Sequence, residues 1–215
     1  MITLLPRLEG RHVRLEPLQR HHAAGLAAAS AIDPSLYALS AVPQGDAAVA
    51  GFVETALAQR DAGVAAPFAV VRVTDDVVIG STRFWDLQRW PWPRGHARHG
   101  GDAPDTCEIG HTWLARPAIR TVANTEMKRL MLGHAFEAWA VASVCLHTDA
   151  RNERSRRAME RIGATFEGIL RAHRLAVELT PRDSARYSIT AAEWPRVRDH
   201  LDHLLTRHYE PAGQP

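Results

Sequence analysis

Short stretches of alternating apolar and polar residues recur along the chain, the pattern of strands that bury one face. The first is 12–18, where two apolar residues stand between charged ones. Two further apolar stretches, 67–73 and 77–87, flank the turn residues Asp75 and Asp76 and predict a hairpin. The other expected strands are 107–115, 143–150, 164–175 and 184–190.

Other stretches space their apolar residues three and four apart, as a helix with one buried side does. Helices are expected at 21–32 and at 46–63, the second with Asp46 as its cap and Gly63 as its stop. The longest is expected from about 124 to 140, with one stripe made of Met127, Leu130, Met131, His134 and Ala138. Two more are expected at 152–162 and 193–208, the last burying Trp194, Val197, Leu201, Leu204 and Leu205.

The order of these elements predicts a mixed α/β sheet in a single domain over 1–215. Between the hairpin and the next strand, residues 88–106 form a loop rich in proline, glycine and histidine. Loops of this length in compact domains are usually functional or mobile. The charged tail after Tyr209 is expected to be frayed.

Composition narrows the class of protein. At 215 residues, 46% apolar and 23% charged, the chain is typical of a folded globular protein. A net charge of +2 argues against a nucleic-acid partner, and the two cysteines, Cys107 and Cys145, are expected as reduced buried thiols. With no leader-like N-terminus and no membrane-spanning run, we expect a cytoplasmic protein without a membrane partner.

Two junctions between a strand and a helix favour anion binding, because the first amides of a helix lack intrahelical acceptors. The first junction is 115–125, where Arg116 and Arg120 precede the helix and the amides of 122–125 point along its axis. The alternative is an ordinary helix start capped by Asn124 or Thr125.

The second junction begins at Asn152, the expected N-cap of the helix at 152–162. Ser155 lies one turn further on the same face, and 151–161 holds five arginines against two glutamates. The alternative is a purely structural reciprocal cap, as in a capping box. Two such junctions at one sheet edge predict a crevice, where α/β sheets bind ligands.

Roughly residues 8 to 207 resemble the GNAT superfamily of N-acetyltransferases, and within it the branch with the ribosomal-protein N-terminal acetyltransferases. The residues that carry the resemblance are Glu108-Ile109-Gly110, Asn124-Thr125-Glu126, Asn152-Glu153-Arg154-Ser155, Gly163-Ala164 and Glu167-Gly168. The resemblance implies direct transfer of acetyl from acetyl-CoA to an amine. It also implies a splayed central sheet flanked by helices, with a V-shaped opening between the fourth and fifth strands for the pantetheine arm.

The chain departs from the family at the pyrophosphate loop, whose pattern is Gln/Arg-x-x-Gly-x-Gly/Ala. The matching residues 119–124 contain no glycine, and Val122 stands at a glycine position. A valine there would clash at positive φ, but it is tolerated if the backbone is right-handed helical and only its N–H is used. The residues expected to bind acetyl-CoA are Arg116, Arg120, Thr121, Val122, Ala123, Asn124, Thr125 and Asn152, with the backbone of Trp113 or Leu114 on the thioester carbonyl.

Acetyl transfer needs a neutral amine, a stabilised carbonyl oxygen and a proton for the leaving thiolate. Glu108, an acid in an apolar strand, is the expected base, acting through water; the alternative is an exposed residue of an alternating strand. By position, the resemblance implies Ser155 as the acid. A carboxylate sometimes found on the sixth strand of such enzymes falls near Arg174, which leaves His173 as a weaker base candidate. Trp85 and Trp90 are expected to shape the acceptor pocket or a dimer contact.

Two functions from different classes follow. The first is an acetyl-CoA-dependent N-acetyltransferase for a primary amine, either a protein N-terminus or a small molecule, with a possible homodimer through the long loop or the final helix. The second is a non-catalytic module of the same fold that binds CoA or a protein partner. A zinc site from His96, His99, Cys107 and His111 matches the usual spacing only loosely, and no metal is expected.

Overall fold

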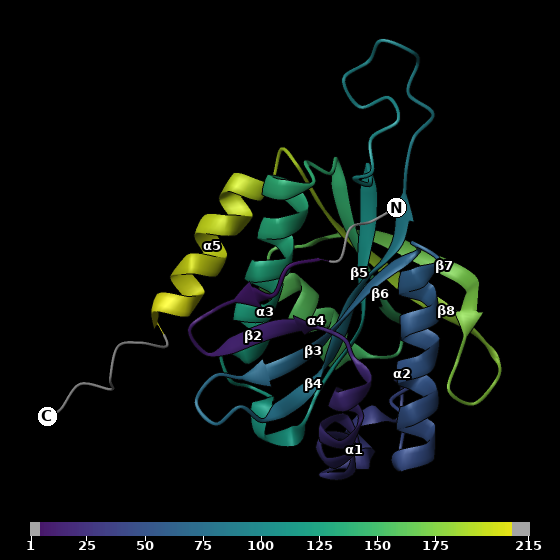
Figure 1. The fold of residues 1–215 in the computed structure, drawn as a ribbon, viewed down its shortest axis with the longest axis vertical. Coiled ribbons are helices and arrows are strands. Elements are labelled where there is room, and N and C mark those ends of the chain that lie inside the picture. The colour runs from purple at the N-terminus through teal and green to yellow at the C-terminus, as the bar shows by residue number, and fades with distance from the viewer. Residues whose placement is uncertain (1–4, 208–215) are drawn as a thin grey trace, which may run out of the picture.

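The computed structural model describes residues 5–207, and the tail after Tyr209 lies outside them. Eight strands form one mixed sheet in the order β1-β2-β3-β4-β5-β6-β8-β7, which confirms the expected α/β class (Figure 1). Every strand expected from the sequence is present, and a two-residue strand precedes them. The strands are β1 Leu8–Glu9, β2 Val13–Pro17, β3 Ala65–Arg72, β4 Val78–Gln88, β5 Thr106–Leu114, β6 Ser143–Asp149, β7 Thr165–Leu175 and β8 Pro181–Thr190.

Helices cover both faces of the sheet, with α1 and α2 on one side and α3 and α5 on the other (Figure 1). None of the described helices is long and apolar enough to cross a membrane. The helices are α1 Ala23–Ala31, α2 Asp46–Asp61, α3 Ala123–Gly133, α4 Glu153–Arg161 and α5 Trp194–Arg207, with 3-10 turns at Arg20–His22, Pro34–Tyr37 and Arg116–Ala118.

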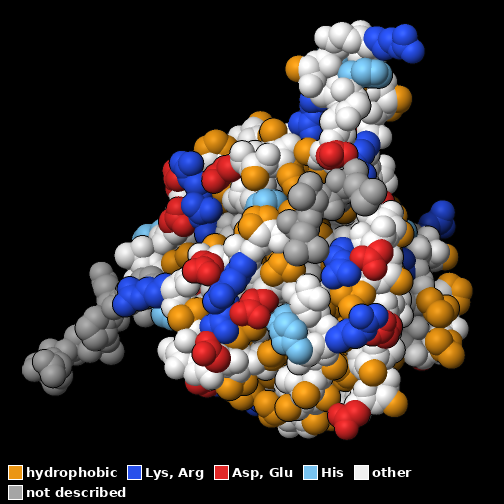
Figure 2. All heavy atoms as spheres, in the orientation of Figure 1, with side chains coloured by type: hydrophobic (Ala, Val, Ile, Leu, Met, Phe, Trp, Pro, Cys, Tyr) orange, Lys and Arg blue, Asp and Glu red, His pale blue; other side chains and the backbone are white. Residues whose placement is uncertain are grey.

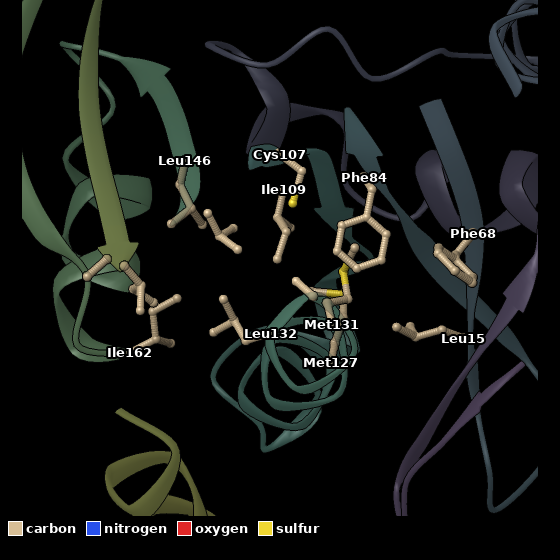
Figure 3. Packing of buried hydrophobic residues seen from close by; sticks show 14 of the residues in the cluster. Leu15, Phe68, Phe84, Cys107, Ile109, Met127, Met131, Leu132, Leu146 and Ile162 are labelled. Carbon is tan, nitrogen blue, oxygen red and sulfur yellow. The ribbon is translucent and has the colours of Figure 1, made fainter. Parts of the chain in front are cut away.

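The larger core lies between the sheet and α3. Figure 3 shows Met127, Met131 and Leu132 of this helix pointing at apolar side chains from strands on both sides of the sheet centre. Their neighbours are Leu15, Phe68, Phe84, Ile109, Leu146 and Ile162, all buried. This packing fixes the start of α3 relative to β5, which carries the candidate site.

The expected helix over 124–140 changes type near its end. The α-helix stops at Gly133, and His134–Ala138 forms a π turn in which the N–H of Trp139 donates to the His134 carbonyl at 3.2 Å. The wider turn shifts the buried side, so that Ala135 and Phe136 are buried. The prediction that Ala138 belongs to the buried stripe is therefore wrong, because this residue is exposed.

The sheet opens between β5 and β6. The two strands pair in parallel only from Thr106↔Ser143 to Glu108↔Cys145, although β5 continues to Leu114 and β6 to Asp149. Beyond Glu108 the strands no longer pair, which is the splay that the resemblance implies. In the same part of β5 the register against β4 shifts, and the bulged residue His111 has a φ of 50°.

The expected long loop projects from the sheet between β4 and β5 (Figure 1). Its base is fastened by the buried carboxylate of Asp105, which accepts from the Trp90 N–H at 2.7 Å and from the Trp92 indole at 2.8 Å. Arg98 lies 2.8 Å from the same carboxylate. Arg98 also donates to the carbonyls of Ala140 at 2.6 Å and Pro104 at 2.8 Å, so two side chains, Asp105 and Arg98, fasten the loop.

Candidate functional site

A cavity of about 890 Å³ lies where β5 and β6 separate. Its wall includes residues from both strands, from the starts of α3 and α4, and from the adjoining ends of β7 and β8. The expected site residues that line it are Trp85, Glu108, Trp113, Leu114, Arg120, Thr121, Asn124, Asn152 and Ser155. The expected residues Arg116, Val122, Ala123, Thr125, Trp90 and His173 are not among its lining side chains.

The loop before α3 does not need a glycine where the family pattern has one. Val122 has φ −65° and ψ −17°, a right-handed helical conformation that a β-branched residue adopts without strain. The positive φ of this loop, 62°, is at Arg120 instead. Of the two possibilities that the sequence leaves open, the structure therefore shows the compatible one.

The first amides of α3 are largely open to a ligand. The Ala123 N–H donates to the Thr121 hydroxyl at 3.2 Å, whereas those of Val122, Asn124 and Thr125 have no acceptor within residues 5–207. The expectation that Asn124 or Thr125 caps the helix is wrong, because among the described residues only the Thr121 side chain accepts from its first amides. The Thr125 hydroxyl points inward and accepts from Arg161 at 2.8 Å.

Positive charge gathers at this end of the cavity. Arg120 from the loop and Arg154, Arg157 and Arg161 from α4 all line it. Arg116 does not, since its guanidinium pairs with Asp33 at 3.1 Å on the surface. Two helix starts and four arginines therefore face one volume, as the binding of phosphate groups requires.

The start of α4 has the expected cap. The side chain of Asn152 accepts from the backbone N–H of Ser155 at 3.1 Å. The Ser155 hydroxyl makes no hydrogen bond within the described chain, and the residue lines the cavity. The structural reading thus explains Asn152 but leaves the hydroxyl of Ser155 available for chemistry.

The backbone of β5 distinguishes between the two candidate amides for the thioester carbonyl. The Ala115 N–H donates to Ile79 at 2.7 Å, towards β4. Because successive amides of a strand alternate in direction, the N–H of Trp113 also points to β4 and that of Leu114 points to the opening. The Leu114 carbonyl accepts from the Tyr37 hydroxyl at 3.1 Å, which holds the strand end in place.

Glu108 lies at the point where the strands separate and is only 2% exposed, so its reading as an exposed strand residue is wrong. Arg174 grips it with two hydrogen bonds, of 2.9 and 2.6 Å. Burial favours the neutral acid, but the contacts with His147 and Arg174 outweigh it and hold the pKa of Glu108 at about 2. The carboxylate is thus ionised at neutral pH and is a weak proton acceptor.

His147 is a site residue that the sequence reading missed. Its Nδ1 atom lies 3.0 Å from a Glu108 oxygen, without the alignment of a hydrogen bond, and its buried Nε2 has no partner in the described structure. The ring is 4.9 Å from that of His173. One signal was present: His147 is on the polar side of a strand whose Val144 and Leu146 are buried.

Lys128 is the second residue that was missed. Although charged, it lies on the sheet side of α3, is 6% exposed and lines the cavity. Its ammonium donates to the Thr112 hydroxyl at 2.9 Å, and that hydroxyl is 2.8 Å from the hydroxyl of Thr82. Burial lowers the pKa of Lys128 to about 7.

The aromatic residues expected near the acceptor divide into two groups. Trp85 lines the cavity and packs edge-on against His111, with ring centres 5.3 Å apart. Trp90 instead lies on the projecting loop, 5.6 Å from the ring of Trp92. His173 reaches the site only through its contact with His147.

The residues of the loose zinc pattern do not come together. His96 stacks on Trp92, Cys107 belongs to the core, and His111 packs on Trp85. Within residues 5–207 one group, Glu16, His21 and His22, has metal-like spacing. There His22 Nδ1 accepts from a backbone amide, so its Nε2 carries the proton shared with Glu16 at 2.9 Å. That histidine is already satisfied without an ion.

Comparison with known proteins places these features in a family. Residues 12–165 match the model of the acetyltransferase (GNAT) domain, whereas no curated protein matches significantly. A GCN5-related N-acetyltransferase from Brucella melitensis has a similar structure, with 26% identity, a TM-score of 0.79 and coverage of 97% of this chain and 90% of that one.

Two further structures are similar. An acetyltransferase-like protein of T. thermophilus is 32% identical, with a TM-score of 0.75 and coverage of 95% of this chain and 100% of the other. RimJ of Mycobacterium smegmatis, in complex with CoA-disulfide, is 20% identical, with a TM-score of 0.71 and coverage of 89% of this chain and 88% of the other. At that identity the likeness to RimJ shows the fold alone.

Proposed function

Because the chain belongs to the GNAT family of acetyltransferases, we propose that it transfers acetyl from acetyl-CoA directly to a primary amine. The observation that supports this most is the continuous cavity between β5 and β6. Helix starts and arginines line one end of it, and the Glu108–His147 pair lines the other. The acceptor is a small molecule or a protein N-terminus.

The donor end fits the phosphate groups of CoA. Open amides at the start of α3, together with Arg120, supply hydrogen bonds and positive charge for the pyrophosphate. The pantetheine arm then runs between the separated strands towards Glu108. The N–H of Leu114 is the donor we assign to the thioester carbonyl, because it stabilises the oxygen as that atom gains charge.

The basicity of Glu108 changes the role expected for it. A carboxyl group with a pKa of about 2 is a poor direct base for an amine. We assign the proton of the attacking amine to Nε2 of His147, which is buried without a partner in the described chain. Glu108, 3.0 Å from the other ring nitrogen, has the task of holding this ring in place. His173, beside the same ring, extends the path towards solvent.

The leaving group also needs a proton. The amine nitrogen forms its bond to the acetyl carbon while the carbon–sulfur bond breaks, and CoA departs as a thiolate. Ser155 is the proposed acid for that sulfur, because its hydroxyl is unbonded in the described chain and lies at the cavity wall. The serine then regains a proton from solvent.

Calorimetry with acetyl-CoA tests the donor site directly. Micromolar binding is expected, weakened at least tenfold in Arg120→Ala, which removes an exposed charge from the cavity rim. Arg116→Ala is the matched control, since this arginine lies nearby but pairs with Asp33. Equal loss in both variants would contradict the assignment, and no binding by the wild type would favour the non-catalytic module.

The sequence also predicted a possible homodimer through the long loop or the final helix. One face of that helix is buried within the fold. Helix α5 buries Trp194, Val197 and Leu201 against the core, so a homodimer would use the projecting loop or the other face of this helix. Figure 2 also shows hydrophobic side chains at the right edge, where Figure 1 places the β7–β8 turn. Leu179 in that turn is 76% exposed.

A further inference from the structure

The charges along the cavity are strongly unequal. Its wall contains one carboxylate, Glu108, and seven basic side chains: Arg120, Lys128, Arg154, Arg157, Arg161, Arg174 and Arg182. Four of these, Arg120 and the three arginines of α4, lie at the donor end. The phosphates of CoA explain that group under the proposed function, but they do not explain the bases at the other end.

Two of the remaining bases are already accommodated by the fold. Arg174 is held by Glu108, whose single negative charge it cancels. Lys128 donates to Thr112, and burial lowers its pKa to about 7, which reduces its charge. Arg182 is left as a cation at the acceptor end without a carboxylate of its own among the described residues.

Arg182 is the second residue of β8 and lies directly across from Arg174 of β7. Its Nε atom is buried and has no hydrogen-bond partner within residues 5–207. The nearby Asp149 is gripped by Arg151, at 2.9 and 2.7 Å. The carboxylate of Asp183, next in sequence, accepts instead from the Ala172 N–H at 2.9 Å. The acids around Arg182 are therefore engaged elsewhere.

A neighbouring arginine of the same strand does have a carboxylate partner, although its Nε also lacks an aligned hydrogen bond in the described chain. Arg186, two positions beyond Ser184 on the same face of β8, pairs with Glu167 at 2.6 Å. Ser184 itself, between the two arginines, has a buried hydroxyl without a partner in the described chain, and so does Nε2 of His147. Arg182 and Ser184, two positions apart on one strand face, thus both have buried polar atoms without hydrogen-bond partners in the described chain.

Arg182 lines the cavity and has no acceptor in the described chain, so its guanidinium is available to bind a ligand oxygen there. Guanidinium groups bind carboxylate and phosphate oxygens best, because their planar fork of donors matches two oxygens. We propose that Arg182 binds an oxyanion carried by the amine acceptor, so that the preferred acceptors are amines with a carboxylate or phosphate group. This inference rests on the proposed acetyl transfer, and it names the class of acceptor.

The arrangement also explains how an anion and Glu108 occupy one site. Arg174 cancels the charge of Glu108, so the second anion meets Arg182 rather than a free carboxylate. The amine of the acceptor then lies towards Glu108 and His147, and its oxyanion towards the start of β8. The oxyanion of the acceptor thus meets the cation Arg182, and its amine lies beside Glu108, whose charge Arg174 cancels.

Steady-state acetylation of matched acceptor pairs tests the proposal. The pairs are ethanolamine with phosphoethanolamine, butylamine with 4-aminobutyrate, and peptide amides with an asparagine or an aspartate after the N-terminal serine. We expect the anionic member of at least one pair to have a KM at least tenfold lower. The pair that responds distinguishes a phosphate, a small carboxylate and an acidic peptide. Equal KM values within every pair would overturn the inference.

The variant Arg182→Gln should abolish the preference by raising KM for the anionic acceptor at least tenfold, while kcat for the neutral acceptor stays within twofold. Arg186→Gln is the matched control, because this arginine shares the strand face but has Glu167 as partner. A preference that survives in Arg182→Gln would also overturn the proposal. Unchanged acetyl-CoA affinity in this variant is required, since weaker donor binding would assign Arg182 to CoA.

Binding separates this inference from the proposed function. The three anionic amines are titrated by calorimetry into the protein saturated with CoA, in wild type and in Arg182→Gln. Binding that depends on Arg182 without acetyl transfer would support the anion site and contradict the acetyltransferase proposal. Acetylation of neutral and anionic amines without preference would support the acetyltransferase proposal and contradict the anion site. An absence of both binding and turnover would contradict both proposals.

Discussion

Arg174 and Glu108 are 66 residues apart in sequence, yet the guanidinium of the first holds the carboxylate of the second at 2.9 and 2.6 Å. The carboxylate sits at the last paired position of β5 and β6. The pair therefore sets the charge at the place where the sheet opens. It keeps Glu108 ionised and in a fixed orientation beside His147.

Replacing Arg174 should move the pH dependence of activity. In the wild type the pKa of Glu108 is about 2, so its protonation contributes no acidic limb at moderate pH. In Arg174→Met, burial is opposed by His147 alone, so the pKa of Glu108 should rise and an acidic limb of kcat/KM should move upward in pH. Arg186→Met serves as control, and identical pH–rate profiles for all three proteins would contradict the assigned role.

The contact between Glu108 and Arg174 should also make the stability of the protein depend on pH. The pKa of Glu108 is lowered on folding from 4.5 to about 2, so ionised Glu108 stabilises the native state above pH 4.5. This contribution, on the order of 3 kcal/mol at most, is lost as the pH falls from 4.5 towards 2. Chemical denaturation of wild type and Glu108→Gln should converge over that window, and parallel curves would count against it.

Substitutions at Ser155 and Asn152 should distinguish a catalytic role from helix capping. Ser155→Ala is expected to lower kcat by roughly 100-fold or more, while acetyl-CoA affinity and the midpoint of thermal unfolding stay almost unchanged. Asn152→Ala removes the cap of α4 and should cost about 1 kcal/mol of stability. Steady-state assays and unfolding curves measure both. If Ser155→Ala behaves like Asn152→Ala, the serine is a structural residue.

Restoring the family's glycine should not improve donor binding. Val122 is already right-handed helical, so Val122→Gly gains no needed conformation and adds freedom to the unfolded chain. We expect acetyl-CoA affinity within about twofold of wild type and a stability loss of roughly 0.5–1 kcal/mol. An affinity gain of tenfold in the calorimeter would show that the valine impairs the loop.

Lys128 should destabilise the protein at neutral pH. Its pKa falls on folding from 10.5 to about 7, so the unfolded chain binds the proton more strongly between these values. Wild-type stability is therefore expected to decrease, relative to Lys128→Met, as the pH falls from about 10 to 7, by a few kcal/mol. Denaturant midpoints at several pH values check this, and a constant difference would refute the lowered pKa.

The features that were predicted correctly from the sequence depend on nearby residues. The Asn152 cap needs only Ser155, three positions away, and the strand pattern of β6 follows from local alternation. The Arg174 contact instead requires the register of three strands and the bulges of β7. For that reason, the sequence marked Arg174 only as an unsuitable base.

Two other features that the sequence did not determine have similar causes. The π turn at His134–Ala138 uses side chains that an α-helix would also accept, so periodicity alone does not reveal it. For Val122 the sequence left two backbone conformations open, since either depends on how the whole loop packs. The structure gives the positive φ to Arg120, shortly before the helix, and removes the conflict.

The projecting loop, fastened at its base by Asp105 and Arg98, should tolerate changes in length. The backbone N–H of Asp105 donates to the carbonyl of Gln88 at 2.7 Å, which closes the base of the loop. In the described structure no residue from 89 to 105 lines the cavity. Because doubling a loop costs only about 0.6 kcal/mol in closure entropy, extra segments fit there cheaply. The tip is therefore a suitable place to insert a reporter or affinity tag. Its length can also vary among related sequences without altering the candidate active site.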